Sequence, residues 1–218
     1  MTSLINYRPP ADPVSKQLNA TMSAATLFLR DGIAAVKMTD VAELAGVGVA
    51  SLYRRFGTKT NLAIAAGTLI WERFNASIRT LLYEERFTGA TGGWRLVQLL
   101  AHYCDEYQRH PDFVRFLDEF DHLVVAEHVA LEDLSSYGEA VDSFYPIFEA
   151  AYREGLSDGS ITREVDFPVF YRTVAHSMMG IAQRIVRGDI IPSDDFTNGT
   201  NELECVVEMA RLTLGIAN

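Results

Sequence analysis

Long apolar runs and secretion signals are missing from this sequence. No stretch of about 18 consecutive apolar residues occurs, so no membrane-spanning helix and no membrane partner are expected. The first residues, MTSLINYRPPADP, lack the basic start and the apolar segment of a signal peptide, so we expect a cytoplasmic protein. The two cysteines, Cys104 and Cys205, lie in apolar helical patterns, which predicts buried, reduced thiols rather than a disulfide.

The usual sequence signatures of catalysis are also missing. There is no Gly-rich phosphate loop, no nucleophile elbow and no paired Cys-His spacing. One polar run places Asp118, Asp121 and His122 on one helical face, where they could act as metal ligands. Such a run is more typical of a solvated helix face. We therefore expect no metal, no cofactor and no enzyme activity, with a metal-dependent helical enzyme as a remote alternative.

Strand-like alternation and internal repeats are lacking, whereas helical periodicity is present along most of the chain. Thr39, Thr58 and Pro111 are typical first residues or caps of helices. Pro146 lies inside a helical pattern, where we expect a kink. The prediction is an all-α fold of about nine helices, with a loose arm over residues 1–12. The expected helices cover 13–32, 39–45, 49–56, 58–82, 94–109, a segment that starts at Pro111, 135–155, 167–187 and 201–216.

Lysine is scarce, and basic groups are unevenly distributed. All three lysines precede residue 60. Residues 1–60 carry seven basic and four acidic groups, whereas the rest of the chain carries twelve and twenty-five, within a net charge of −10. DNA attracts a basic head and repels an acidic body, which orients docking. We therefore predict a DNA-binding domain over residues 13–60 and a larger helical domain for ligand binding and dimerisation over residues 61–218.

The most informative segment is residues 39–59, TDVAELAGVGVASLYRRFGTK. Two short amphipathic segments flank a glycine turn at residues 46–48, which is the pattern of a helix-turn-helix that presents its second helix to the DNA major groove. The Ala-Gly-Val turn, the Leu-Tyr and Phe that follow at fixed offsets, and Thr58-Lys59 closely resemble the tetracycline-repressor (TetR) family. The resemblance covers roughly residues 20–65 and implies a helix-turn-helix head on a larger helical body.

The second helix of the motif has one apolar face and one polar face. At about 100° per residue, Leu52 and Phe56 turn toward the core of the head. The opposite face offers side chains suited to base edges, because Arg pairs with guanine, Ser with several bases and Ala with the thymine methyl group. We therefore predict base contacts from Ala50, Ser51, Arg54 and Arg55.

The resemblance to the TetR family also implies phosphate contacts. Matching positions are Thr39, Tyr53 and Lys59, which carry donors near helix ends or the groove edge. Gly48 stands where the family often has Ser, so a phosphate contact there must come from the backbone. Arg54 and Arg55 also depart from the family pattern, so the operator sequence does not transfer from relatives.

The helices over 167–187 and 201–216 are apolar on most sides, which indicates burial on two sides. One side can meet the chain's own core, and the other needs a partner. In the TetR family the two matching helices form a four-helix dimer interface, so we expect a homodimer. The residues predicted to lie in this interface are Phe170, Val174, Met178, Ile181, Ile185, Val206, Ala210 and Leu214.

The body is rich in aromatic residues and methionines, most of which we expect in the core. In the TetR family a small inducer usually binds a pocket made by the fifth to eighth helices, and such a pocket needs a few polar groups among apolar ones. The candidate pocket residues are His102, Tyr103, Tyr107, Phe116, Phe120, Asp121, Tyr145, Phe148, His176, Met179 and Gln183.

These features predict a DNA-binding transcriptional regulator, a homodimeric repressor that a small-molecule effector releases from its double-stranded DNA operator. A helix-turn-helix protein whose body docks another protein and senses no ligand is the alternative. We expect induction to work through residues 58–82, the only helix that runs continuously from the head into the body. Gly67 in this helix is either a soft point or a site of close packing.

Overall fold

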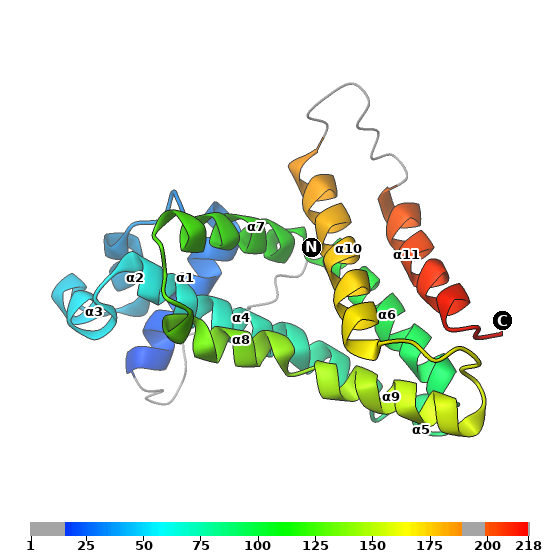
Figure 1. Cartoon of the computed structure of the whole chain (residues 1–218). Coiled ribbons are helices and arrows are strands. Elements are labelled where there is room, and N and C mark those ends of the chain that lie inside the picture. Colours follow the sequence, from blue (N-terminus) through cyan, green and yellow to red (C-terminus); the bar gives the residue numbers. More distant parts are fainter. Residues whose placement is uncertain (1–15, 189–198, 218) are drawn as a thin grey trace. The chain divides into compact units, whose positions relative to one another are not determined.

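The computed structural model describes residues 16–188 and 199–217, and within these ranges the fold is entirely helical (Figure 1). None of the described helices is both long and apolar enough to cross a lipid bilayer. The elements are α1 (Lys16–Asp31), α2 (Met38–Ala45), α3 (Val49–Phe56), α4 (Lys59–Leu81), α5 (Glu85–Thr88), α6 (Gly92–Arg109), α7 (Pro111–Ala126), the 3-10 helix η1 (Leu131–Leu134), α8 (Ser135–Asp142), α9 (Tyr145–Asp158), α10 (Phe167–Arg187) and α11 (Gly199–Thr213).

The all-α prediction is confirmed, and the helix boundaries differ at few places. The described residues form eleven α-helices instead of nine, because α5 is an additional short helix and the segment 135–155 is divided. We expected a kink at Pro146, but the helix breaks there. Pro146 lies in the first turn of α9, where its missing N–H has no intrahelical acceptor to lose. The loose arm and Pro13 lie outside the described residues.

The described residues form two compact units. Among the described residues, unit 1 comprises 16–74 and 112–142, and unit 2 comprises 75–111, 143–188 and 199–217. Helix α4 continues through the division after Phe74. Packing therefore assigns α7 and α8 to the same unit as the helix-turn-helix. The predicted boundary between residues 60 and 61 concerns function and stays a prediction.

Unit 1 has an aromatic core in which α4, α7 and α8 meet. Phe74 stacks on Phe113 with ring centroids 4.7 Å apart, and Trp71 meets both rings edge-on. The Trp71 indole also donates a hydrogen bond of 3.0 Å to the Tyr137 hydroxyl, which satisfies its one polar group. Phe120 stacks on Tyr137 at 4.5 Å. These contacts hold three helices in a fixed arrangement beside the head.

Unit 2 is organised around α6, which packs against α9 and α11, while α10 and α11 lie side by side (Figure 1). The first N–H groups of α6 have no acceptors within their own helix. Asp158 accepts from Gly92 N–H and Ser160 accepts from Gly93 N–H, both at 2.8 Å. The end of α9 and the residues after it therefore cap the start of α6.

The two cysteines have different surroundings. Cys104 is buried as expected, and burial raises the pKa of its thiol to about 12. Cys205 is exposed, so the prediction that it is buried is wrong. It lies on the outward face of α11, whereas Val206 on the next position faces the unit's core. Sequence periodicity alone does not distinguish two neighbouring apolar stripes of one helix.

Gly67 is a site of close packing. A Cβ atom at this position would lie 3.0 Å from the Tyr137 ring and 3.4 Å from Phe116. We predict that Gly67→Ala destabilises the protein by about 1–3 kcal/mol, because an added methyl group in a packed core forces rings to shift. Gly138→Ala is the matched control, since no atom lies within 4 Å of its Cβ and it should stabilise α8 by up to about 1 kcal/mol. Urea unfolding measures both, and equal stability of Gly67→Ala and wild type would contradict the packing argument.

Candidate nucleic-acid interface

Helices α2 and α3 form the predicted helix-turn-helix. Gly46 ends α2 in the left-handed conformation, with φ of 66°, and its N–H is directed at the carbonyls of Ala42 and Glu43. Gly48 then precedes α3 in an extended conformation without a side-chain cap. The tight turn therefore depends on a residue without a Cβ atom at position 46. It brings α3 back across α2, as the sequence pattern predicts.

The start of α2 differs from the sequence prediction. Lys37 is the N-cap residue, and Thr39 lies inside the first turn, so Thr39 does not cap the helix. The carboxylate of Asp40 accepts a hydrogen bond of 2.8 Å from the Lys37 N–H, which fixes the entry of the chain into the helix. Thr39 is exposed and its hydroxyl donates to Asp40 at 3.3 Å. Its position at a helix N-terminus still suits a phosphate contact.

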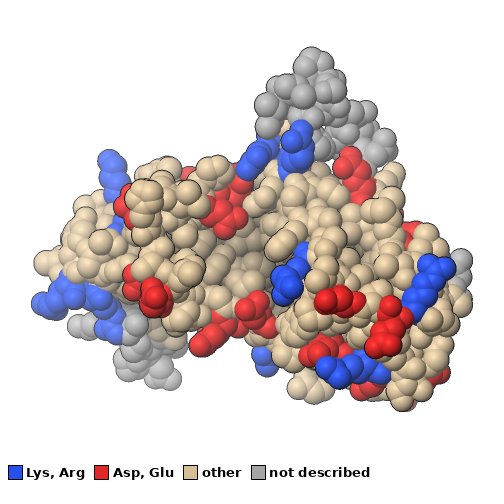
Figure 2. All heavy atoms as spheres, viewed as in Figure 1, with Lys and Arg blue, Asp and Glu red and all other residues tan. Residues whose placement is uncertain are grey.

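Helix α3 divides into a buried and an exposed face as predicted. Leu52 and Phe56 are buried. Tyr53 is 51% exposed, and the predicted base-contacting residues lie outside the core: Ala50, Arg54 and Arg55 are exposed and Ser51 is half-buried. In Figure 2 the end of unit 1 that carries α3 presents Lys and Arg atoms. This face therefore combines basic and small polar groups without acidic residues from α3 itself.

A hollow of about 320 Å³ borders this face of α3. Ser51, Arg54 and Arg55 line it together with the turn residues Gly46 and Gly48. Arg54 donates a long hydrogen bond of 3.4 Å to Ser51, so both side chains are held near each other. Guanidinium groups beside exposed backbone are suited to phosphate or base oxygens.

Lys59, the first residue of α4, contacts the loop between α1 and α2. Its ammonium group donates a hydrogen bond of 3.2 Å to the carbonyl of Ala34. The pKa of Lys59 is lowered, because burial outweighs the opposite effect of the negative charges of Glu119 and Asp40. The backbone N–H of Asn61 donates a hydrogen bond of 3.0 Å to the Thr58 hydroxyl oxygen. This bond confirms Thr58 as the cap of α4. Lys59 therefore has a defined position at the edge of the motif.

Two residues of α7 contact the end of α1, a feature that the sequence analysis missed. Arg115 donates to the carbonyls of Leu29 and Arg30 at 2.5 and 3.4 Å, and Glu119 accepts from the Ile33 N–H at 2.5 Å. Carbonyls at the end of a helix lack intrahelical donors, so Arg115 satisfies groups that α1 leaves unpaired. Helix α4 is therefore not the only element that joins the head to the following helices, because α7 also contacts it.

The candidate ligand residues do not all fall in one unit. Phe116, Phe120 and Asp121 belong to unit 1, and the other eight belong to unit 2. Asp121 and His176 are exposed. In unit 2, Tyr103 meets Phe148 edge-on at 5.5 Å, with Tyr107 and Phe144 also in edge contact. The remaining predicted residues, His102, Tyr145, Met179 and Gln183, are half-buried.

Five of the eight predicted dimer residues require a correction. Val174, Met178, Val206, Ala210 and Leu214 are buried within the chain itself, so they are not available to a partner. Phe170, Ile181 and Ile185 are half-buried. Instead, α11 exposes Cys205, Met209 and Leu212, which lie four and three residues apart and form one stripe, and α10 exposes Val169. The exposed apolar face of α11 therefore lies next to the face that was predicted to form the dimer interface.

The polar run of α7 has contacts of its own. The His122 ring lies 2.7 Å from the carbonyl of Asp118, and Asp121 and His122 are exposed. Within the described ranges no group of three or more His, Cys, Asp or Glu side chains is arranged to hold a metal ion. Glu119 of the same run contacts the head instead.

The geometry of α1–α4 agrees with comparisons to known proteins. The family model of the bacterial regulatory proteins of the tetR family matches residues 22–66. The chain is 30% identical over 141 residues to the HTH-type transcriptional repressor NicS of Pseudomonas putida, an alignment that covers 63% of this chain and 64% of NicS. It is 26% identical over 172 residues to the HTH-type transcriptional repressor KstR2 of Rhodococcus jostii, which covers 75% of this chain and 78% of KstR2.

A solved structure with a similar fold is the transcriptional regulator FadR from Bacillus subtilis in complex with stearoyl-CoA. It has a TM-score of 0.63 at 14% identity, and the match covers 90% of this chain and 98% of FadR. At this identity the likeness concerns the fold alone. The family model and the helix-turn-helix geometry confirm the resemblance found in residues 39–59. Residues 22–66 of this chain therefore carry the DNA-binding head of the bacterial regulatory proteins of the tetR family.

Proposed function

We propose that this protein is a homodimeric transcriptional repressor that acts in the cytoplasm, binds an operator in double-stranded DNA and is released from it by a small-molecule effector. The observation that carries the proposal is the exposed face of α3, where Ala50, Ser51, Arg54 and Arg55 stand on a helix-turn-helix. Arg reads guanine, and small or hydroxyl side chains contact other base edges. Thr39, Gly48, Tyr53 and Lys59 flank this face, where phosphates of a bound duplex would lie.

The exposed stripe of α11 and the exposed Val169 of α10 support the homodimer. Met209 and Leu212 are 53% and 54% exposed, and Val169 is 53% exposed. A stripe of exposed apolar side chains, such as that of Cys205, Met209 and Leu212, is typical of a protein interface. A two-fold dimer would place two copies of α3 in successive major grooves, about 34–36 Å apart.

Release by an effector is supported by the contacts of the head. Both α4 and α7 hold it, α4 through Lys59 and α7 through Arg115 and Glu119. A ligand that shifts either helix would move α3 relative to its copy in the dimer. The ligand releases DNA only as far as it prefers the displaced state, and a hundredfold loss of DNA affinity needs about 2.7 kcal/mol of such preference. FadR with stearoyl-CoA is an example of this fold with a bound small molecule. The alternative, a body that docks a protein and senses no ligand, predicts that no small molecule changes DNA affinity.

Arg54→Ala and Arg55→Ala should each weaken operator binding by roughly 1–3 kcal/mol and relax base preference at one position per half-site. Fluorescence anisotropy on DNA selected from a random pool, with single base changes, measures this. Arg73→Ala is the control, because Arg73 is an exposed arginine on α4 away from the motif. Unchanged affinity and base preference in both α3 variants would show that the assigned face is wrong.

Lys59→Ala should weaken binding to all sequences alike, because a phosphate contact carries no sequence information. Each phosphate contact that is lost should reduce the slope of log affinity against log salt by about one. Titrations at several salt concentrations test this prediction. A change in base preference without a change in slope would argue against a phosphate contact.

Met209→Glu and Leu212→Glu should convert the dimer to monomers, because a charge in an apolar interface is costly to desolvate. Leu131→Glu is the matched control, since Leu131 is an exposed leucine, 82% accessible, in unit 1. Light scattering at micromolar concentration gives the mass. A wild-type mass of one chain, or dimers in both α11 variants, would contradict the proposed interface.

A further inference from the structure

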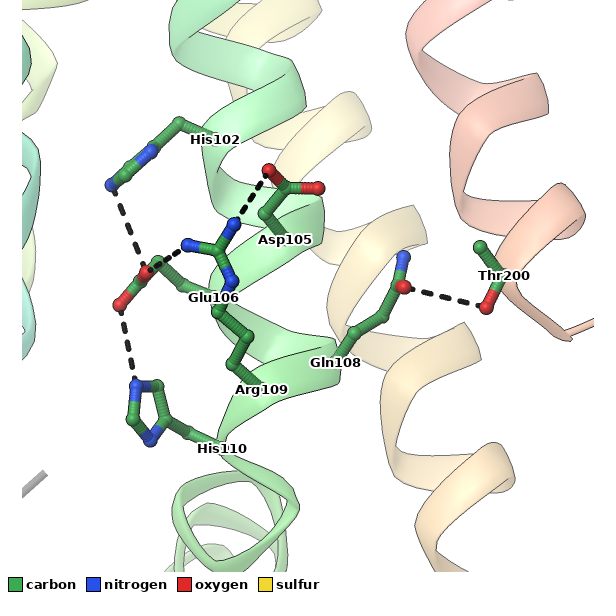
Figure 3. Close-up of polar contacts among 7 residues, drawn as sticks. All are labelled: His102, Asp105, Glu106, Gln108, Arg109, His110 and Thr200. Atoms are coloured by element: carbon green, nitrogen blue, oxygen red, sulfur yellow. Dashed lines mark hydrogen bonds and ion pairs between the residues drawn. The ribbon is translucent and has the colours of Figure 1, made fainter. Parts of the chain in front are cut away.

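Three polar side chains lie along one face of α6 at intervals of four residues. They are His102 and Glu106 of α6 and His110, the C-cap residue that follows it (Figure 3). Figure 3 shows them on the same side of the helix, while Gln108 points to the other side, where it contacts Thr200 of α11. Glu106 is 4% exposed, so a carboxylate stands in the interior of the protein. A buried charge of this kind needs compensation.

The contacts of Glu106 compensate the burial of its negative charge only in part. Arg109 donates to Oε1 at 3.3 Å, and His102 Nε2 is 3.9 Å from the same oxygen. His110 Nε2 lies 3.6 Å from Oε2, which is too far for a hydrogen bond. Among the described residues, Glu106 Oε2, His102 Nε2 and His110 Nδ1 are buried and have no hydrogen-bond partner. Native interiors leave few such atoms, so three in one cluster require an explanation.

The charge balance of the cluster is negative. Burial lowers the pKa of His102, and the charge of Glu106 offsets this only in part, so the imidazole is largely neutral at neutral pH. Arg109 is shared between Glu106 and Asp105, and its side chain is 60% exposed. Glu84 adds a further negative charge near His102. A cation that enters the cluster would meet the Glu106 carboxylate, with the further negative charges of Asp105 and Glu84 and the positive charge of Arg109 acting near His102.

We propose that Glu106, flanked by His102 and His110, anchors a cationic nitrogen group of the effector, such as a protonated amine or amidine. This inference rests on the proposed function, because it names the chemical class of the effector. A group with several N–H donors can serve Glu106 Oε2 and the acceptor nitrogen of a neutral histidine at once. Charge-assisted hydrogen bonds inside a protein are among the strong ones. A buried water offers the same hydrogen bonds without the charge, so charge is the property to test.

The first experiment compares charged and neutral probes on the wild-type protein without DNA. Ethylamine, n-hexylamine and 2-phenylethylamine are each paired with the alcohol of the same carbon skeleton, at constant ionic strength and pH. Calorimetry and thermal shift measure binding. At least one amine should bind about tenfold or more tightly than its alcohol, because only the amine neutralises the carboxylate. If no amine binds better than its alcohol, the site takes water or a neutral group and the proposal is wrong.

The second experiment tests whether amine binding depends on the charge of Glu106 or on the overall negative charge of the protein. Glu106→Gln keeps the shape and removes the charge, and Asp105→Asn is the matched control on the next residue, whose side chain is 56% exposed. Amine binding should be lost in Glu106→Gln and kept in Asp105→Asn. Without ligand, Glu106→Gln should melt at the same or a higher temperature, because it removes a poorly compensated buried charge. A destabilised or unfolded Glu106→Gln protein, or equal amine binding by both variants, would overturn the proposal.

DNA titrations with and without the amine keep the two proposals distinguishable. An amine that binds through Glu106 and leaves DNA affinity unchanged would support the anchor and contradict release by this ligand. Specific DNA binding by a protein that ignores every amine would retain the DNA-binding function and contradict the anchor.

Discussion

The hydrogen bonds between α7 and the end of α1 are the constraint on which the DNA-reading face depends. Arg115 holds the last carbonyls of α1, and Glu119 holds the N–H of Ile33 in the loop that follows. This loop leads directly into α2, and α2 positions α3 through the turn at Gly46. The orientation of Arg54 and Arg55 therefore depends on a contact outside the helix-turn-helix, between Ile33 and Glu119, which are 86 residues apart in the chain.

Aromatic packing gives α7 the rigidity that this role needs. Its inner face meets α4 and α8 through Phe113, Phe116 and Phe120, and Gly67 admits the Tyr137 ring against α4. A shift of α7 would disturb a close-packed interior, which resists gradual deformation and favours discrete arrangements. Such an interior can pass a displacement to the head, because both α4 and α7 contact it.

Sequence patterns predicted the helix-turn-helix and its exposed face because Leu52 and Phe56 define a single apolar stripe on a short helix. They also predicted the extent of α10 to the residue, although that helix is apolar on most sides. They did not predict which face of α11 is exposed, because the helix has two neighbouring apolar stripes. The buried stripe contains Val206 and Ala210, and the exposed one contains Cys205, Met209 and Leu212.

Contacts between distant segments escaped the sequence analysis altogether. Glu119 stood in a polar run that suggested solvent or metal, and nothing local indicates that its partner is Ile33. Glu106 gave no signal beyond its spacing from two histidines, since burial of a carboxylate is set by the fold. Pro146 shows the opposite case: the sequence analysis singled out the residue but expected a kink, whereas it lies in the first turn of a new helix, a position that proline favours.

DNA affinity of Glu119→Ala tests most directly whether α7 sets the orientation of the head. Hydrogen exchange at the Ile33 amide first establishes that the contact is lost, with exchange expected to accelerate about tenfold or more. The account predicts that specific DNA affinity then falls by about tenfold, because an unanchored head must be ordered when DNA binds. Faster exchange at Ile33 together with wild-type DNA affinity would contradict the account.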